Sequence, residues 1–331
     1  MIRTLTFDIA TLVPYIDWVY FLHAWGFPPR FSSIARVHEC AACCSAWIAT
    51  MPEEDRLRAQ EIIKLYDDAQ ATLKQMAEAK VQAKARVGLF PTWSENEDIV
   101  LVTTKEEVRL NFLRQQHSSS PQKPNYCLAD YIAPRAVSRY QEVHFPMSGT
   151  LENQAGLVLQ ASAMGVFAAT VHAEQMKGAD DAYHTLMVET LTQRLAEACA
   201  ERMHEVVRKE IWGYASAEDL AVEDILTEKY VGLRPAVGYP SLPDLSLNFD
   251  LDGVIDFGEI GVSLTESGMM VPQSSVSGLL LAHPKAQHFA VGRIGEDQLK
   301  DYASRRGKSV DELRKYLKYS SPCHNKFIED E

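Results

Sequence analysis

The clearest periodic pattern of the chain lies between residues 53 and 84, where apolar side chains recur every three or four positions and the opposite face is charged. The apolar positions include Ile62, Tyr66, Ala69, Leu73 and Met76. That spacing matches the turn of an α-helix. The pattern predicts an amphipathic helix over 53–84, which Gly88 and Pro91 then end.

Two further stretches, residues 155–175 and 181–212, predict long helices. The first is strongly apolar, but Gln160, Ser162 and Thr170 interrupt it, so it lacks the ~20 uninterrupted apolar residues of a membrane span. We expect it to form a buried helix. The second carries an apolar stripe at helical spacing.

Shorter apolar runs predict strands at 98–104 and 109–115, and a hairpin at 275–294 whose two apolar runs flank the turn sequence HPKAQ. Two short helices follow, and Ser309 stands at the N-cap of the second, with Glu312 at the spacing of a capping box. Helices and strands are mixed without strict alternation. This mixture favours an α+β fold, with an antiparallel sheet flanked by long helices, over a doubly wound α/β fold.

The polar sequence SSSPQKPN at 118–125 predicts a loop. This loop is a candidate boundary between the helical N-terminal part and the remainder. From the pattern of elements we divide the chain into an N-terminal helical part at 1–90, an α+β core at 91–319 and a mobile polar tail at 320–331.

Composition and charge exclude some classes of partner. The formal net charge of −12 disfavours nonspecific binding to nucleic acid or to an anionic membrane, so neither partner is expected. Six cysteines occur without a secretory signal, which indicates reduced thiols in a cytoplasmic protein. The cysteines within 37–51 are interpreted as buried helix residues, because the run is apolar and the adjacent Cys43 and Cys44 suit a tetrahedral metal site poorly. No metal site is predicted.

The sequence RPAVGYP at 234–240 has a composition that neither a helix nor a central strand favours. Its prolines fix their own φ and push the preceding residues into extended conformations, so we expect a stiff loop largely unable to pair in a sheet. Gly238 allows close approach to the backbone, Arg234 offers donors for a carboxylate, and Tyr239 offers a ring and a hydroxyl. These residues alone leave two interpretations open, a structural turn and a site for a small ligand with a carboxylate and a planar base.

The same sequence resembles the R-P-A-X-G-Y-P signature of the S-adenosylmethionine-binding activation domain of cobalamin-dependent methionine synthase. Other motifs of that family follow in the same order, and the resemblance extends from about residue 14 to residue 318. These motifs are PYIDW at 14–18, GLFP at 88–91, LRQQ at 113–116, NYCLADYIAP at 125–134, RLAEACAERMHEVVRKEIWGYA at 194–215, LTESGMMVPQSSVSG at 264–278 and HPKAQHFAV at 283–291. Several motifs in one order are more specific than any single one, so the resemblance implies the α+β fold of that domain.

The resemblance implies a site for S-adenosylmethionine, which carries a sulfonium, an ammonium, a carboxylate and an adenine. Arg234 is expected to pair with the carboxylate. Asp17 and Glu197 are expected to balance the positive groups or to bond ribose and amine donors. Backbone groups around Ala236 and Gly238 are expected to bind the adenine edge.

Two of these acidic residues also have purely structural interpretations. Asp17 precedes an aromatic cluster and could simply cap a helix. Glu197 shares one face of its predicted helix with Glu201 and His204, and without the resemblance that face would be assigned to solvent.

The resemblance also implies a reaction. In that family an electron donor such as flavodoxin re-reduces inactive cob(II)alamin, and methyl transfer from S-adenosylmethionine then traps the cobalamin in its methylated form. This in-line displacement needs no general acid or base, so the protein contributes binding and orientation. Tyr239 is the residue expected nearest to the methyl group.

The chain also departs from the family. Leu279–Leu281 replace an aromatic W-Y-F triplet, and His288-Phe289 stand where the family has Tyr-Phe, so aromatic surface near the ligand is expected to be reduced. His288 and Phe289 are still assigned to the binding site. No histidine of the chain lies in the D-X-H-X-X-G motif of cobalamin modules, so the corrinoid is expected on a partner chain and this protein is expected to be a free-standing activation subunit. Reactivation of another corrinoid methyltransferase and a non-catalytic S-adenosylmethionine-binding module stay open as alternatives.

Residues 300–318 carry seven lysines and arginines against three acidic residues, on a chain whose net charge is negative. This patch predicts a docking surface for an acidic electron donor such as flavodoxin, with Arg305 and Arg306 at its centre. An ordinary charged helix is the alternative.

Overall fold

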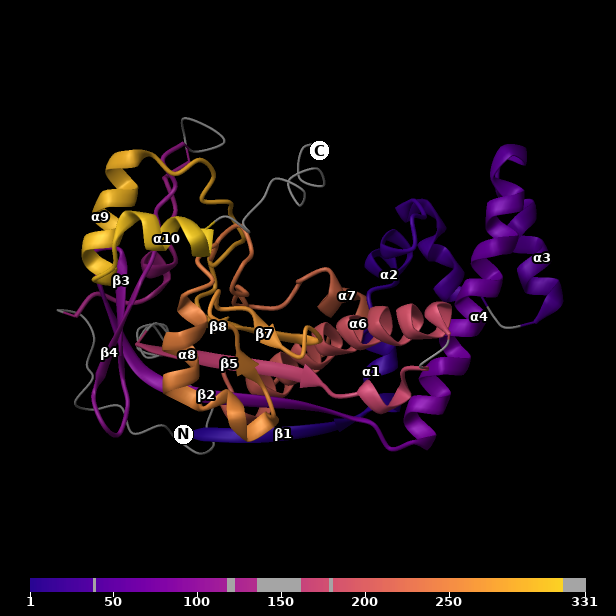
Figure 1. Ribbon diagram of the computed structural model, residues 1–331, viewed down its shortest axis with the longest axis horizontal. Coiled ribbons are helices and arrows are strands. Elements are labelled where there is room, and N and C mark those ends of the chain that lie inside the picture. The colour runs from indigo at the N-terminus through magenta and orange to yellow at the C-terminus, as the bar shows by residue number, and fades with distance from the viewer. Residues whose placement is uncertain (38–39, 118–122, 136–161, 179–180, 318–331) are drawn as a thin grey trace.

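An antiparallel sheet of six strands runs through the middle of the computed structural model, which describes residues 1–37, 40–117, 123–135, 162–178 and 181–317 (Figure 1). The strands are β1 (Ile2–Asp8), β2 (Gln82–Glu95), β3 (Asp98–Val102), β4 (Glu107–Asn111), β5 (Ala163–Val171) and β8 (Ser275–Leu280). Their order is β4-β3-β2-β5-β8, and β1 pairs with the first half of β2. A second sheet consists of β6 (Ser263–Leu264) and β7 (Met270–Val271).

Helices cover both faces of the six-stranded sheet. They are α1 (Ile9–Leu12), α2 (Trp18–Ala24), α3 (Ala41–Ala49), α4 (Arg56–Glu78), α6 (Ala182–Val206), α7 (Val222–Leu226), α8 (Leu247–Ile255), α9 (Glu296–Arg306) and α10 (Val310–Leu317). One core joins α1, α2, α4 and α6 to one face, and a second core joins α8 to the other. This arrangement confirms the predicted α+β class with an antiparallel sheet and long helices. No helix in the described part of the chain is long and apolar enough to cross a membrane.

The helix predicted at 155–175 is wrong, because residues 163–171 form the central strand β5. Phe167 and Ala169 face the core that contains α6, whereas Val166 and Ala168 face the core that contains α8. A strand buried on both faces is continuously apolar, and hydrophobic periodicity does not separate it from a buried helix. The first residues of the stretch, 155–161, lie outside the described residues.

The helix predicted at 53–84 is confirmed only as far as Glu78, where α4 ends. Lys80 has a φ of 55°, a left-handed conformation that cannot continue the helix. From Gln82 onward, polar and apolar residues alternate, and they form β2 with every second side chain buried over its first half. The boundary drawn at residue 90 therefore falls inside β2, and Gly88 and Pro91 lie within this strand.

The hairpin predicted at 275–294 is also wrong beyond its first half. Residues 275–280 form β8, which pairs with β5, and the residues after Leu281 do not return along β8 as a second strand. The other edge of β8 is taken by residues 233–237, which bond to it through isolated bridges. Apolar runs on both sides of a turn sequence indicated a local partner, but the partners of β8 are distant in the chain.

Other predictions are confirmed. The strands at 98–104 and 109–115 correspond to β3 and β4, with β4 beginning two residues earlier and ending four residues earlier than predicted. The helix at 181–212 is α6 followed by a π-helical turn at Val207–Ile211. Ser309 caps α10, because its hydroxyl accepts a hydrogen bond from the Glu312 amide at 3.2 Å. The tail at 320–331 lies outside the described residues.

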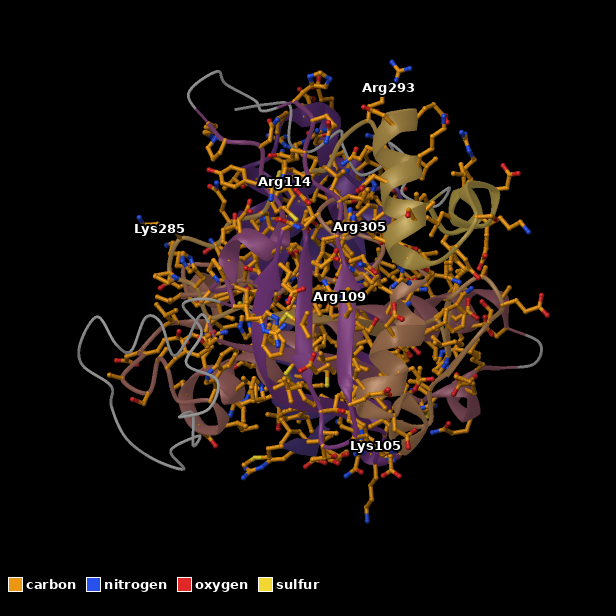
Figure 2. All side chains as sticks on the ribbon, turned by 90° about the vertical axis from the view of Figure 1, so that its left-hand side faces the viewer. Lys105, Arg109, Arg114, Lys285, Arg293 and Arg305 are labelled. Carbon is orange, nitrogen blue, oxygen red and sulfur yellow. The ribbon has the colours of Figure 1, made fainter. Side chains whose placement is uncertain are left out.

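The basic patch predicted at 300–318 is partly neutralised by internal ion pairs. Arg305 belongs to the last turn of α9 (Figure 2), and its Nη1 is 2.5 Å from a carboxylate oxygen of Asp98. The Arg306 side chain is 5% exposed, and its Nη1 is 2.5 Å from Asp250. These two arginines fasten α9 to β3 and α8, so much of their charge is already paired within the fold. Docking of an electron donor on this patch stays a prediction.

Candidate functional site

The RPAVGYP loop lies along the edge of β8 that β5 leaves open. The Val237 amide donates to the Ser277 carbonyl at 2.9 Å, and the Leu279 amide donates to the Pro235 carbonyl at 3.0 Å. The expectation that the loop is unable to pair is therefore wrong here, because proline carbonyls and the intervening amide still form bonds. A Cβ on Gly278 would lie 2.1 Å from the Pro235 carbonyl oxygen, so the approach requires glycine.

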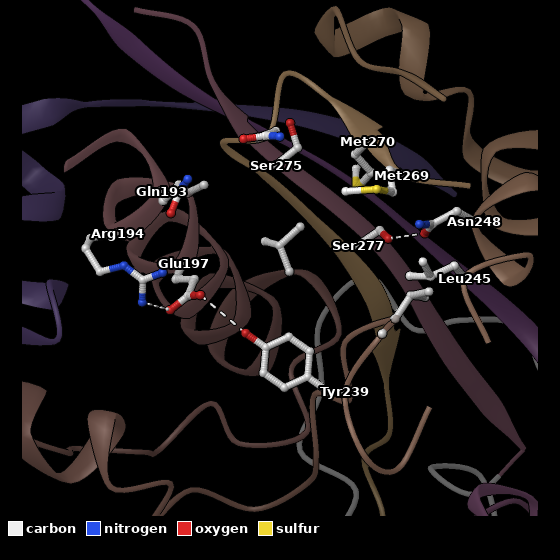
Figure 3. Close-up of a pocket in the computed structure, with 15 residues that line it drawn as sticks. Gln193, Arg194, Glu197, Tyr239, Leu245, Asn248, Met269, Met270, Ser275 and Ser277 are labelled. Carbon is white, nitrogen blue, oxygen red and sulfur yellow. Dashed lines mark hydrogen bonds and ion pairs between the residues drawn. The ribbon is translucent and has the colours of Figure 1, made fainter. Parts of the chain in front are cut away.

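A pocket of about 470 Å³ opens between α6, this loop, β8 and the segment that contains β7 (Figure 3). It is lined by Gln193, Arg194, Ala196, Glu197, Val237, Gly238, Tyr239, Leu245, Asn248, Met269, Met270, Gln273, Ser275, Val276 and Ser277. Its volume lies in the range of small-molecule sites. The lining combines methionine and aliphatic surface with amide, hydroxyl and charged groups, which suits a ligand with both apolar and polar parts.

Three residues predicted for the site, Glu197, Gly238 and Tyr239, line this pocket. The Tyr239 hydroxyl donates to Glu197 Oε1 at 3.3 Å, and Arg194 Nη1 donates to Glu197 Oε2 at 2.8 Å (Figure 3). The Tyr239 residue is 42% exposed. Desolvation of the hydroxyl, followed by the charge of Glu197, raises the pKa of Tyr239. The hydroxyl is therefore neutral near pH 7 and acts as a donor. A φ of 90° at Gly238 allows the turn that directs Tyr239 to the pocket.

Arg234 lies behind the pocket rather than in its wall. Its Nη2 pairs with Glu201 Oε1, and its guanidinium lies 5.8 Å from the centre of the Phe167 ring. The two side chains of the ion pair are 11% and 15% exposed. Burial raises the pKa of Glu201, and the charge of Arg234 opposes that rise. The pair therefore fixes the beginning of the loop to α6.

Acidic side chains also surround Tyr20, which α2 contributes. Burial raises the pKa of Tyr20, and the charges of Asp17, Glu197 and Glu228 raise it further. Asp17 also accepts a hydrogen bond from the Val19 amide at 2.8 Å, which confirms its interpretation as the N-cap of α2. Arg194 acts in the opposite direction, since its guanidinium lies 5.7 Å from the centre of the Tyr20 ring and pairs with Glu197. Asp17, Glu197 and Glu228 thus form an acidic surface around Tyr20 that Arg194 partly neutralises.

The remaining predicted residues do not line the pocket. His288 Nε2 is 3.0 Å from Glu228 Oε1, and although burial opposes ionisation of Glu228, this partner holds the Glu228 pKa below its usual value. His288 therefore reaches the acidic surface only through Glu228. Phe289 packs toward Tyr126, with ring centres 5.9 Å apart.

Ala236 and the leucine triplet lie in the sheet edge. Ala236 is buried where it bridges to Gly278. Leu279–Leu281 are buried in the two cores on either side of the sheet. The expectation that this triplet reduces the ligand surface is therefore wrong, because its side chains face the interior.

A buried polar network supports the segment that leads into the loop. The fully buried Arg208 pairs with Glu218 at 2.6 Å, and its guanidinium lies 4.1 Å from the centre of the Tyr230 ring. His204 packs on the same ring at 4.8 Å, and its Nε2 is 3.3 Å from the Tyr214 hydroxyl. Arg208 Nη1 and His204 Nδ1 have no hydrogen-bond partner among the described residues. The position of residues 230–234 over α6 therefore rests on the Arg208–Glu218 pair and on the packing of both side chains against Tyr230.

The assignment of Glu201 and His204 to a solvated helix face is wrong, because residues 230–234 cover that face of α6. Arg194 and Glu228 were not predicted as members of the site. Arg194 stands one helical turn before Glu197, a spacing that indicates an ion pair, and this was the available signal. Glu228 carried no comparable signal.

Replacing His204 with glutamine is expected to remove part of the acid sensitivity of the fold. Burial, followed by the charges of Arg208 and Arg234, holds the pKa of His204 well below 6.5. The unfolded chain therefore binds a proton near pH 6.5 that the folded chain does not, so stability is complete above this pH and falls below it. At about pH 5 the cost reaches about 2 kcal/mol in the wild type and is absent from the variant.

Urea unfolding at about pH 7.5 and about pH 5 measures this difference. His184→Gln, on the same helix and partly exposed, serves as the control and should lose as much stability as the wild type. Equal losses in wild type and His204→Gln would show that His204 does not set the acid limit.

The geometry of the site agrees with the comparisons with known proteins. A family described as "Vitamin B12 dependent methionine synthase, activation domain" matches residues 8–307. Among solved structures, the chain is similar to one titled "Crystal Structure of the MetH Reactivation Domain bound to AdoHcy", with 32% sequence identity and a TM-score of 0.76. The match covers 97% of this chain and 90% of that chain. The similarity therefore includes the sheet, both helical layers and the loop.

Proposed function

The chain belongs to the activation-domain family of vitamin B12-dependent methionine synthase, and on this premise we propose that it binds S-adenosylmethionine and supports the reductive methylation of cob(II)alamin. The cobalamin would be carried by the cobalamin-binding module of a methionine synthase outside this chain, and a flavodoxin-like donor would supply the electron. The observation that carries the proposal is the juxtaposition of the Tyr239–Glu197 contact, the pocket beside it and the acidic surface around Tyr20.

The charge of the site fits this ligand. S-adenosylmethionine carries two positive groups and one carboxylate, so its net charge is positive. Glu197 and Asp17 would face the sulfonium and ammonium groups, with Glu228 adding to the same field. Arg234 would donate to the carboxylate only if Glu201 and the ligand share its guanidinium, because the pair with Glu201 is buried behind the pocket.

The backbone of the loop would bind the adenine. The Gly238 amide already donates to the Leu242 carbonyl at 2.8 Å. A ligand would therefore meet the carbonyls around Ala236 and Gly238, which suit the amino group of an adenine.

S-adenosylmethionine supplies an electrophilic methyl group, which the reduced cobalt of a corrinoid accepts. Tyr239 is the side chain that we propose lies nearest to this methyl group, since Glu197 holds its hydroxyl at the pocket wall. No proton transfer is required of Tyr239, and its contribution is orientation of the donor. His288 and Phe289 would contribute to the rim on which the corrinoid module docks.

Glu197→Gln is expected to weaken binding of S-adenosylmethionine about tenfold, which corresponds to about 1.4 kcal/mol. It should weaken binding of S-adenosylhomocysteine less, because that ligand lacks the positive sulfonium. Calorimetric titration of both ligands measures the two effects. Glu189→Gln, on the same helix but paired with Lys177 outside the pocket, should bind both ligands like the wild type. Equal losses for the two ligands would refute the charge role of Glu197.

The reaction is tested with methyl-labelled S-adenosylmethionine, reduced flavodoxin and a methionine synthase that holds cob(II)alamin but lacks its own activation domain. Label in the cobalamin that depends on this protein supports the proposal. Tight ligand binding without methyl transfer would instead favour a non-catalytic binding module. Methyl transfer only to the corrinoid of a different methyltransferase would favour the alternative that this protein reactivates that enzyme.

A further inference from the structure

Two cysteine sulfurs meet at the beginning of α3. Cys40 is the N-cap residue of this helix and is exposed, and Cys43 lies one turn later and is half-buried. Their Sγ atoms are 2.6 Å apart, and both thiols are free. This separation is far closer to the ~2.05 Å of a disulfide bond than to ordinary contact between side chains. A disulfide between the two cysteines would therefore require little movement of the backbone.

The local field gives the two sulfurs different properties. The contact with the Cys43 thiol, followed by a hydrogen bond that the Cys43 amide donates to Cys40 Sγ, lowers the pKa of Cys40. The same contact with Cys40 raises the pKa of Cys43. Helix N-termini and Cys-X-X-Cys spacing favour a thiolate at the first position. Cys40 is therefore the better nucleophile, and Cys43 keeps its proton until a later step.

Two other cysteines in the described part of the chain lack this environment. Cys127 and Cys199 are buried, and burial raises the pKa of Cys127 to about 12. Burial also raises the pKa of Cys199. The expectation that the cysteines at 37–51 are buried is wrong, because Cys40 is exposed and Cys43 and Cys44 are only half-buried. They lie at the beginning of α3, which projects from the end of the molecule opposite α9 (Figure 1).

We propose that Cys40 and Cys43 form a redox-active dithiol that exchanges with disulfides in solution or on a partner protein. In the first step the Cys40 thiolate attacks one sulfur of the incoming disulfide, and the other sulfur leaves with the electron pair as a thiolate. In the second step Cys43 loses its proton and attacks Cys40 Sγ, and the remaining sulfur leaves. The two cysteines are oxidised to one disulfide, and the incoming disulfide is reduced to two thiols.

The order of attack follows from access. Cys40 stands at the open end of the helix, whereas Cys43 is partly covered by its own helix and its neighbours. An incoming disulfide therefore reaches Cys40 first, and Cys43 is the resolving residue. No group of three potential metal ligands is present in the part of the chain that the structure describes.

The test uses the full chain, equilibrated with mixtures of reduced and oxidised glutathione, alkylated and analysed by mass spectrometry. The expected product is a Cys40–Cys43 disulfide, with loss of two hydrogen atoms from the peptide that contains both. Cys43→Ser should instead accumulate a stable mixed disulfide between Cys40 and glutathione. A second arm with oxidised thioredoxin shows whether a protein disulfide reacts faster than the small one. Reaction in either arm supports the proposal, and the faster arm shows whether the incoming disulfide is a small molecule or a protein.

Cys44→Ser is the matched control, because Cys44 is on the same helix but outside the pair, and it should form the disulfide like the wild type. In Cys43→Ala/Cys44→Ser, Cys40 should be alkylated with a pH midpoint nearer to the ~8.5 of a free cysteine than in Cys44→Ser, because the hydrogen bond from Cys43 is gone. Two free thiols after equilibration in both arms would overturn the proposal. Stoichiometric zinc that protects both thiols from alkylation would also overturn it.

Discussion

Replacing Arg234 by alanine is expected to lower the free energy of unfolding by about 3–5 kcal/mol. The Arg234–Glu201 pair is almost entirely buried, with both side chains less than one-sixth exposed. Alanine would leave the Glu201 carboxyl in that place without its counter-charge, and one of its oxygens already lacks a hydrogen-bond partner among the described residues. Equilibrium unfolding in urea near neutral pH measures the loss.

Two further variants show whether the unpaired carboxyl is the cause. Arg194→Ala removes an arginine whose partner, Glu197, is 36% exposed, and it should cost less than about 1 kcal/mol. The double variant Arg234→Met, Glu201→Leu removes both buried charges and should recover most of the lost stability. A double variant as unstable as Arg234→Ala would contradict the explanation.

The double variant also separates folding from binding. A loss of S-adenosylmethionine binding in Arg234→Ala alone has two causes, a missing contact to the ligand and a displaced loop. If Arg234 pairs with the ligand carboxylate, the recovered double variant stays folded and still binds about tenfold or more weakly. Wild-type affinity in a stable double variant would limit Arg234 to a structural role.

Gly278→Ala is expected to displace the RPAVGYP loop from β8 and to abolish measurable binding of S-adenosylmethionine. The new Cβ would lie 2.1 Å from the Pro235 carbonyl oxygen, 2.9 Å from Ala236 Cα and 3.0 Å from the Phe167 ring. Two of these atoms belong to a proline-restricted backbone and the third to a buried ring, so none of them can shift without straining the structure around it. Overpacking of this kind costs about 1–3 kcal/mol or more.

The loss of binding follows because Val237, Gly238 and Tyr239 form one wall of the pocket. Calorimetric titration with S-adenosylmethionine and urea unfolding are the measurements. Gly253→Ala is the matched control, since this glycine is inside α8 and a Cβ there meets nothing within 4 Å. That variant should bind normally and gain about 0.5–1 kcal/mol of stability. Normal binding by Gly278→Ala would show that the loop tolerates displacement.

Both predictions concern the same design of the site. The loop is held at its beginning by the ion pair with α6 and along its length by β8, before any ligand is present. A preorganised loop spends less of the binding free energy on ordering. In the proposed function, the acidic surface would favour a positively charged ligand.

Much of this protein was predictable from the sequence. Periodicity identified α6 and most of α4, because their apolar side chains recur at helical spacing. The capping sequence at Ser309 located α10. The unusual composition of residues 234–240 identified the loop and its chemistry, and the order of the motifs identified the family. In all these cases the signal lies within a short stretch of chain.

The failures share a different cause. The sequence of β5 predicted a helix because this strand is buried on both faces and is continuously apolar. The beginning of β2 was predicted as part of the α4 helix, whereas in the structure the left-handed conformation of Lys80 separates the two. β8 lacks a local partner, and its neighbours come from β5 and from the loop. Strand identity depends on pairing between distant segments, which local patterns do not specify.

The same limit applies to charge. The sequence provided Arg234, Glu197 and Arg306 as candidates, and only the tertiary structure decided what each one contacts. Arg234 pairs with the buried Glu201, and Glu197 accepts a hydrogen bond from Tyr239 at the pocket. Arg306 pairs with Asp250 of α8. The partner of a long side chain is chosen by which elements pack together and by how much water remains there, and both are properties of the folded chain.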